Sequence, residues 1–210
     1  SATVKTSLQG GASGSSSPIT VSSLTNGESY NVRASAINVF GQSPYSDATS
    51  IDPNNLTGQV GVFGGGNTHS AYVNTIQYIN FASATSTSDF GDLNNAVETM
   101  GCAASSTRAV WGGGYTAGGR INVIDYITIL TKGNATDFGD LSAVSNNNSG
   151  NSSNTRAVFA LGYTNAYSNV LEYITIASTG NATDFGDQTQ AKGLTAATAS
   201  TTRIVFGGGT

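Results

Sequence analysis

A sequence repeat of 47 or 48 residues runs through most of the chain, and it limits the possible folds more strongly than any other feature. Its landmarks are an aromatic residue in a short apolar segment, a tyrosine, and a phenylalanine within Asp-Phe-Gly-Asp. The three columns of landmarks are Phe63, Trp111, Phe159 and Phe206; Tyr78, Tyr126 and Tyr173; and Phe90, Phe138 and Phe185. Independent columns that share one step indicate a tandem array of small units, which must stack to bury a continuous core.

Each unit has the sequence pattern of β-strands. Residues 123–130 and 170–176 are mostly apolar or β-branched on both alternating faces, so both faces of these strands should be covered. We expect the glycine triplets after the apolar segments to form turns, and Gly133 and Gly180 to mark the next hairpin. Small residues at 196–200 suit a crowded innermost strand. The pattern predicts an all-β fold with four antiparallel strands per unit, stacked as the blades of a β-propeller.

These residues resemble the kelch repeat, which combines an apolar strand ending in two glycines, a later tyrosine, and an aromatic residue about a dozen positions further on. The matching residues are Trp111, Gly112, Gly113, Tyr126 and Phe138 in one copy and Phe159, Tyr173 and Phe185 in the next. The usual late tryptophan is phenylalanine in every copy, and Ala160-Leu161 replaces two glycines. The resemblance implies divergent kelch-like blades over residues 58–210.

Residues 58–210 hold three repeats and the start of a fourth, whereas closed propellers have about 4–8 blades. An incomplete ring would leave apolar blade faces and strand edges open. We therefore expect the chain to be a piece of a longer polypeptide. The ring would be completed by further residues of that polypeptide, which we favour, or by other subunits.

Residues 1–52 lack the repeat and show a second pattern. Tyr30, Val32, Ala34 and Ala36 alternate with polar residues, which predicts a half-buried strand. The other predicted features are a strand with Ile19 and Val21 and turns at Asn26-Gly27 and at residues 38–41. The segment resembles the carboxy-terminal half of a fibronectin type III domain, which implies a partial β-sandwich with Tyr30 at the tyrosine corner. Residues 53–57 are expected to be a linker whose flexibility Pro53 limits.

The composition excludes several functional classes. The chain has one cysteine, Cys102, whereas a disulfide framework, a zinc ribbon or an iron–sulfur site needs several. Its one histidine, His69, is expected to be an exposed turn residue. With 8 Lys and Arg and a net charge of −4, the chain lacks the basic patch that nucleic acid or an anionic membrane attracts. We expect no enzymatic activity, no cofactor, no bound metal and no membrane insertion.

The Asp-Phe-Gly-Asp segments also permit other interpretations. A kinase is excluded, because the Gly-rich loop, strand lysine and catalytic loop that accompany Asp-Phe-Gly in kinases are missing. The paired carboxylates could bind calcium if neighbouring groups supply further oxygens. These pairs are Asp89 and Asp92, Asp137 and Asp140, and Asp184 and Asp187. We favour a structural role, in which the phenylalanines fill the space between blades and Asp and Gly shape a turn, with calcium binding as the open alternative.

The candidate ligand-binding residues lie in the connection between the glycines and the tyrosine strand, which varies from repeat to repeat. Tyr72, Arg120 and Tyr167 form one column of this connection, and Tyr115 and Tyr163 form another. Variation in a surface loop is typical of a binding face. Tyrosine also offers a flat apolar area with a polar tip, which suits a sugar ring. The sequence leaves two interpretations of these columns: ordinary variation of a surface loop, which we favour, and a glycan-binding face.

A fibronectin-type module joined to kelch-like repeats, low in charge, resembles bacteriophage tail-fibre and other virion-appendage proteins. The resemblance implies a non-enzymatic, extracellular virion protein that attaches to a host-surface glycan or receptor. It also implies contacts with other virion or fibre subunits, for which a homo-oligomer is one arrangement. The alternatives are a bacterial extracellular adhesin or wall-associated protein of the same architecture, or part of a secreted polysaccharide-degrading enzyme.

Overall fold

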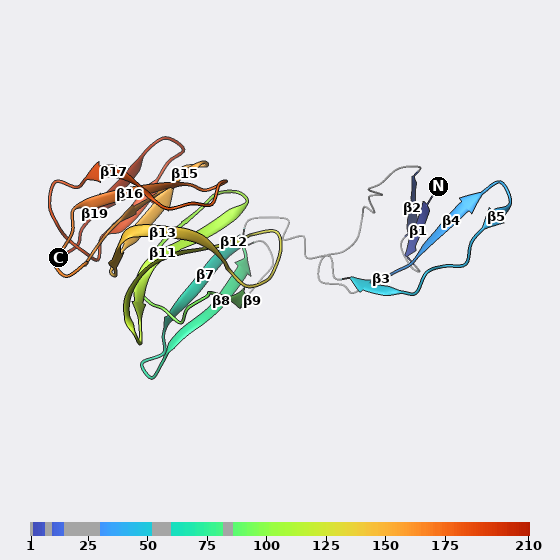
Figure 1. The fold of residues 1–210 in the computed structure, drawn as a ribbon, viewed down its shortest axis with the longest axis horizontal. Helices are drawn as coiled ribbons and strands as arrows, with labels where there is room; N and C mark the ends of the chain where they lie inside the picture. Colours follow the sequence, from blue (N-terminus) through green and yellow to red (C-terminus); the bar gives the residue numbers. More distant parts are fainter. Residues whose placement is uncertain (1, 7–9, 15–29, 52–59, 82–85) are drawn as a thin grey trace. The chain divides into compact units, whose positions relative to one another are not determined.

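The computed structural model describes residues 2–6, 10–14, 30–51, 60–81 and 86–210 (Figure 1). Within these ranges the regular secondary structure is β-strand, arranged in several small antiparallel sheets that do not form a closed ring. The described ranges hold no helix long and apolar enough to cross a bilayer. The chain divides into two compact units, Ser1–Leu56 and Thr57–Thr210. The expected turn at Asn26-Gly27, the strand with Ile19 and Val21, and the linker 53–57 lie outside the described residues.

The first unit contains a four-stranded antiparallel sheet with the strand order β2-β1-β4-β5 and a separate pair of strands, β3 and β6. The strands are β1 (Ala2–Thr6), β2 (Gly10–Gly14), β3 (Tyr30–Val32), β4 (Ala34–Asn38), β5 (Gly41–Gln42) and β6 (Thr49–Ile51). Asn38 pairs with Gly41, so Val39 and Phe40 form the expected tight turn. Beyond it, Ser43 and Ser46 continue the pairing with Ala36 and Ala34 through backbone and side-chain hydrogen bonds of 2.7–3.0 Å.

The expected alternation along residues 30–36 is wrong in its second half. Tyr30 and Val32 are half-buried as predicted, but Ala34 and Ala36 are exposed and Ser35 is buried. The reason is a break at Arg33, which belongs to neither β3 nor β4. Because side chains alternate with a period of two, one irregular residue moves the following residues to the opposite face.

The second unit consists of four successive antiparallel sheets, each built from strands in sequence order (Figure 1). The first sheet has β7 (Val60–Asn67), β8 (Tyr72–Asn80) and β9 (Ser88–Asp92). The second has β10 (Gly101–Ala104), β11 (Arg108–Thr116), β12 (Gly119–Thr128) and β13 (Thr136–Ser145). The third has β14 (Ser149–Ser152), β15 (Arg156–Ala160), β16 (Val170–Thr175) and β17 (Thr183–Asp187). The fourth has β18 (Ala196–Ala199) and β19 (Ile204–Gly207). Four strands per unit is thus confirmed for the second and third sheets.

The turns expected at the glycine triplets and at Asp-Phe-Gly-Asp are wrong, because both segments are irregularities inside strands. Gly65 and Gly113, with φ of 66° and 68°, lie within β7 and β11, where the register shifts by one residue. Asp-Phe-Gly-Asp likewise lies within β9, β13 and β17, and its phenylalanine is the extra residue of a β-bulge. Glycine serves a bulge for the same reason that it serves a turn, because it accepts positive φ without steric cost. The sequence signal for the two structures is therefore the same.

Successive sheets pack face to face through the first column of aromatic residues. Trp111 covers Gly64 of the first sheet, where an added methyl group would lie 3.0 Å from Cε2 of the indole. Phe159 covers Gly112 of the second sheet in the same way, at 3.3 Å, and is fully buried. The first strands of the second, third and fourth sheets also touch in series, β10 against β14 and β14 against β18. The glycines thus admit the large aromatic side chains that join the sheets.

The junctions between sheets also contain buried carboxylates that the sequence analysis did not single out. Asp125 in β12 accepts hydrogen bonds from the backbone N and the Nδ2 of Asn94, at 3.0 and 2.6 Å. Glu172 in β16 accepts a bond of 3.1 Å from the backbone N of Ser142 in the same manner. Burial raises the pKa of Asp125 above its ordinary 3.8, the bonds from Asn94 oppose this shift, and the charge of Asp137 adds to it.

Candidate functional site

All five predicted ligand-binding residues lie at the same end of the first three sheets. Tyr115 pairs across β11 and β12 with Arg120, and Tyr72 pairs across β7 and β8 with Asn67. Tyr163 and Tyr167 form an isolated bridge between β15 and β16. Because the connection after the glycines has the same place in each sheet, stacking the sheets brings these positions into one line.

The five residues touch one another in sequence, and we call them the tyrosine row. The rings of Tyr72 and Tyr115 are 6.3 Å apart across the first junction. Across the second junction, the guanidinium of Arg120 lies over the ring of Tyr163 at 5.1 Å. Tyr163 meets Tyr167 edge to face at 5.7 Å. The row is a continuous track of partly exposed aromatic surface with one cation in its middle.

Arg120 has no carboxylate partner among the described residues. Its Nη2 donates to Oδ1 of Asn165 at 2.6 Å, and its other contact is the ring of Tyr163. An amide and an aromatic ring position the guanidinium but leave its full positive charge uncompensated. A planar guanidinium of this kind is suited to bind a carboxylate.

Buried polar atoms without hydrogen-bond partners gather at this same end of the sheets. Within the described part of the chain they are Oγ1 of Thr99, Nε of Arg120, Oδ1 of Asn146 and Nε2 of Gln188. Arg120 belongs to the row, and the other three follow β9, β13 and β17, the last strands of the first three sheets, directly or within a few residues. A buried polar atom without a hydrogen-bond partner is energetically costly.

The backbone at this end is strained in a repeating way. Thr99, Asn147 and Leu194 occupy one position of the repeat, and their φ values are 60°, 55° and 56°. Positive φ is unfavourable for a β-branched threonine and for leucine, and such strain often occurs at functional sites. This column is not recognisable in the sequence, because the three residue types differ and only asparagine is typical of the conformation.

Two adjoining hollows flank the tyrosine row at Tyr72. Their volumes are about 480 and 570 Å³, and both are lined by Asn67 and His69. His69 is an exposed residue with a φ of 70° between β7 and β8, which confirms its expected place in a turn. One hollow also reaches Thr99, whose hydroxyl lacks a partner among the described residues.

The described residues contain neither a cluster of metal ligands nor an activated thiol. No three His, Cys, Asp or Glu side chains of the described ranges come close enough to hold a metal ion. Although Cys102 is exposed as a residue, the groups around its thiol partly desolvate it and raise its pKa, which is the direction opposite to that of a nucleophilic thiol. Comparison with models of known protein families and with curated protein sequences finds no significant match to this chain.

Proposed function

We propose that the second unit is an arc of a kelch-like β-propeller that binds glycans through the tyrosine row. Two features support the propeller. The complete sheets are four-stranded antiparallel meanders, and their first strands touch in series, as strands around a common axis do. For the first unit we propose a partial fibronectin type III sandwich, because the order β2-β1-β4-β5 corresponds to a C′-C-F-G sheet.

The single observation that carries the binding function is the continuity of the tyrosine row. The residues of the row come from three sheets and were predicted because they vary between repeats. The distances between their ring centroids, or between the Arg120 guanidinium and a ring centroid, are 5.1–6.3 Å. Aromatic faces stack on the apolar faces of sugars, and the polar tips of the tyrosines exchange hydrogen bonds with sugar hydroxyl groups. The uncompensated charge of Arg120 favours a sugar that carries a carboxylate.

In this proposal the chain belongs to a virion appendage of the tail-fibre type, where it is exposed on the outside and attaches to the host surface without catalysis. An extracellular bacterial adhesin would use the same face in the same way. A secreted polysaccharide-degrading enzyme would need reactive groups outside the tyrosine row, because the row itself contains no pair of carboxylates.

Glycan binding is tested with the full chain on an array of neutral and acidic oligosaccharides. We expect the affinity to fall about fivefold or more in Tyr115→Ala and in Tyr163→Ala, since one stacked aromatic ring contributes about 1 kcal/mol. Tyr45→Ala is the matched control, because this exposed tyrosine lies in the first unit. No binding to any glycan or host surface, or equal loss in the control, would refute the proposal.

The enzyme alternative is separated by its product. Incubation of the full chain with a bound polysaccharide should release no new reducing ends. An increase of reducing ends over hours would favour the enzyme and contradict simple attachment.

A further inference from the structure

One face of the third sheet is uncovered at a position where the first and second sheets are each covered by the following sheet. We call it the open face, and we call the two covered positions the closed junctions. Phe90 and Phe138 are each 2% exposed, whereas Phe185, at the same position of the repeat, is 53% exposed. The contacts within its own sheet are the same, because all three phenylalanines meet a tyrosine edge to face at 5.7–6.0 Å. The difference in exposure between Phe185 and the other two phenylalanines therefore comes from what packs against this face of each sheet.

At the two closed junctions the cover is a hairpin of the following repeat. The backbone N atoms of Gly133 and Ala135 donate to the carbonyl oxygens of Phe90 and Asp92, at 2.9 and 2.7 Å. Oδ1 of Asn134 accepts from the backbone N of Asp92 at 3.1 Å.

The second junction repeats all three bonds with the next hairpin. Gly180 and Ala182 donate to Phe138 and Asp140 at 2.8 Å each, and Asn181 accepts at 3.1 Å. The described residues provide no such bond to Phe185 or Asp187.

Glycine contacts show the same difference between the closed junctions and the open face. Gly91 and Gly139 have no room for a side chain, because the Gly133 and Gly180 turns lie against them. A side chain at Gly186, which holds the same position in the third sheet, would meet no atom within 4 Å.

Carboxylate contacts differ in the same way. Asp125 and Glu172 lie nine residues before the asparagines of the two covering hairpins, and they bind the backbone of the preceding sheet at Asn94 and Ser142. Thr189 holds the position of Asn94 and Ser142 in the third repeat, and no carboxylate of the described residues bonds to its backbone. The open face therefore lacks both the turn and the carboxylate of a covering hairpin.

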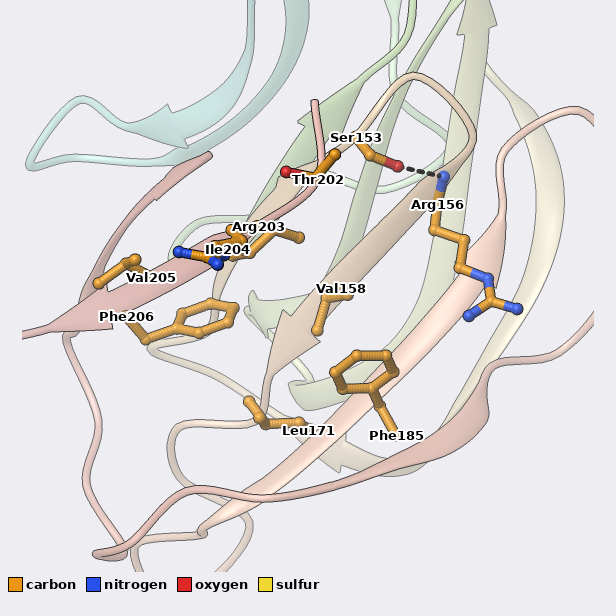
Figure 2. A pocket seen from close by; sticks show the side chains of 10 residues that line it. All are labelled: Ser153, Arg156, Val158, Leu171, Phe185, Thr202, Arg203, Ile204, Val205 and Phe206. Atoms are coloured by element: carbon orange, nitrogen blue, oxygen red, sulfur yellow. Dashed lines mark hydrogen bonds between the residues drawn. The ribbon is translucent and has the colours of Figure 1, made fainter. Parts of the chain in front are cut away.

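The open face forms an apolar groove of about 420 Å³ between the third and fourth sheets. Figure 2 shows the side chains of Val158, Leu171 and Phe185 on one side of this space and Phe206 on another. The fourth sheet consists of β18 and β19 alone, so the second edge of β19 has no neighbouring strand among the described residues. Such an edge can accept an added strand.

We propose that this groove binds an antiparallel β-hairpin with the chemistry of residues 125–135 and 172–182. Such a hairpin carries a carboxylate, then Tyr-Ile-Thr-Ile, then three residues and Gly-Asn-Ala. Its first strand pairs with the edge of β19, its isoleucines fill the groove at Phe185, its carboxylate accepts from the backbone at Thr189, and its Gly-Asn turn bonds to Phe185 and Asp187. The inference does not depend on glycan binding.

A second copy of this chain is poorly suited to fill the groove, because it offers no free hairpin with both the carboxylate and the Gly-Asn turn. The first sheet, whose Phe63 and Phe81 are exposed, has Gln77 where the carboxylate is needed and Thr85-Ser86 where Gly-Asn is needed. The other two hairpins of a copy are already packed against its own sheets. Self-association is therefore an outcome that counts against the proposal.

The test titrates the full chain into a fluorescent peptide of residues 116–145 and follows anisotropy. We expect saturable 1:1 binding and slower hydrogen exchange in β17 and β19. Phe185→Ser should weaken binding by at least about tenfold. A peptide with Asp125→Ala and Asn134→Ala should lose a similar amount. Phe40→Ser is the control, because Phe40 is 96% exposed in the first unit.

Because a free hairpin folds poorly, the same segment is also joined directly after Thr210. Thr210 occupies the position of Tyr115 and Tyr163, so residue 116 follows it in the register of the repeat. We expect the Tm of the second unit to rise by about 4 °C or more, and less with the doubly substituted segment. Absence of both peptide binding and a Tm increase overturns the proposal, as does a dimer of the chain that Phe185→Ser converts to a monomer.

Discussion

Two phenylalanines at one position of the repeat provide a direct test of sheet stacking. Phe159 is fully buried between the second and third sheets, where it covers Gly112 and also meets Gly101 and Gly150. Phe63 occupies the same position in the first sheet but is 57% exposed. The residue type and the local strand are the same, so truncation of each to alanine measures the packing between sheets.

The expected costs differ severalfold. Replacing a fully buried phenylalanine by alanine removes its apolar area and leaves a cavity, which costs about 3–5 kcal/mol. Phe63 has less than half of its surface covered and leaves no closed cavity, so Phe63→Ala should cost at most about 2 kcal/mol. We expect Phe159→Ala to destabilise the second unit by at least about 2 kcal/mol more than Phe63→Ala.

The assay is urea unfolding followed by the fluorescence of Trp111, the single tryptophan. Trp111 is 5% exposed and lies against Gly64, so its emission reports on the second unit. Circular dichroism of each variant before unfolding establishes that both start from the same β-structure. Equal costs for the two variants would refute the stacked arrangement, because burial at the junction would then contribute nothing.

Three further predictions rest on the junctions and the tyrosine row. Gly64→Ala should lower stability by about 1–3 kcal/mol because its methyl group meets Trp111, while Gly207→Ala, which meets no atom within 4 Å, should change it little; urea unfolding compares them. Because the pKa of Asp125 is raised in the folded state, the wild type should lose stability relative to Asp125→Asn as pH rises from about 3.8 through that raised pKa. Tm values from pH 3 to 7 check this, and the opposite trend would show that the bonds from Asn94 dominate. Arg120→Gln should weaken the binding of acidic glycans by about tenfold and the binding of neutral glycans by much less, and calorimetry can measure both affinities.

Much of the second unit could be predicted because a repeat imposes the same local choices several times. The strand pattern, the four-strand units and the hairpins at Gly133 and Gly180 all follow from alternation and turn chemistry. The tyrosine row could also be predicted, since equal positions of stacked units must form lines. The bulges could not, because glycine with positive φ serves a turn and a bulge equally well.

The period, the all-β class and the columns of residues that share a structural position all follow from the amino-acid sequence alone. What each member of a column does depends on the folded molecule, because burial is set by the neighbouring sheet and not by the residue. Phe138 is covered and Phe185 is open, although their local sequences are nearly identical. In the sequence Asp125 is a polar interruption of an apolar strand, yet the adjoining sheet makes it a buried acceptor. A linear pattern records which positions are equivalent, whereas the free energy of each position is set by contacts between residues distant in sequence.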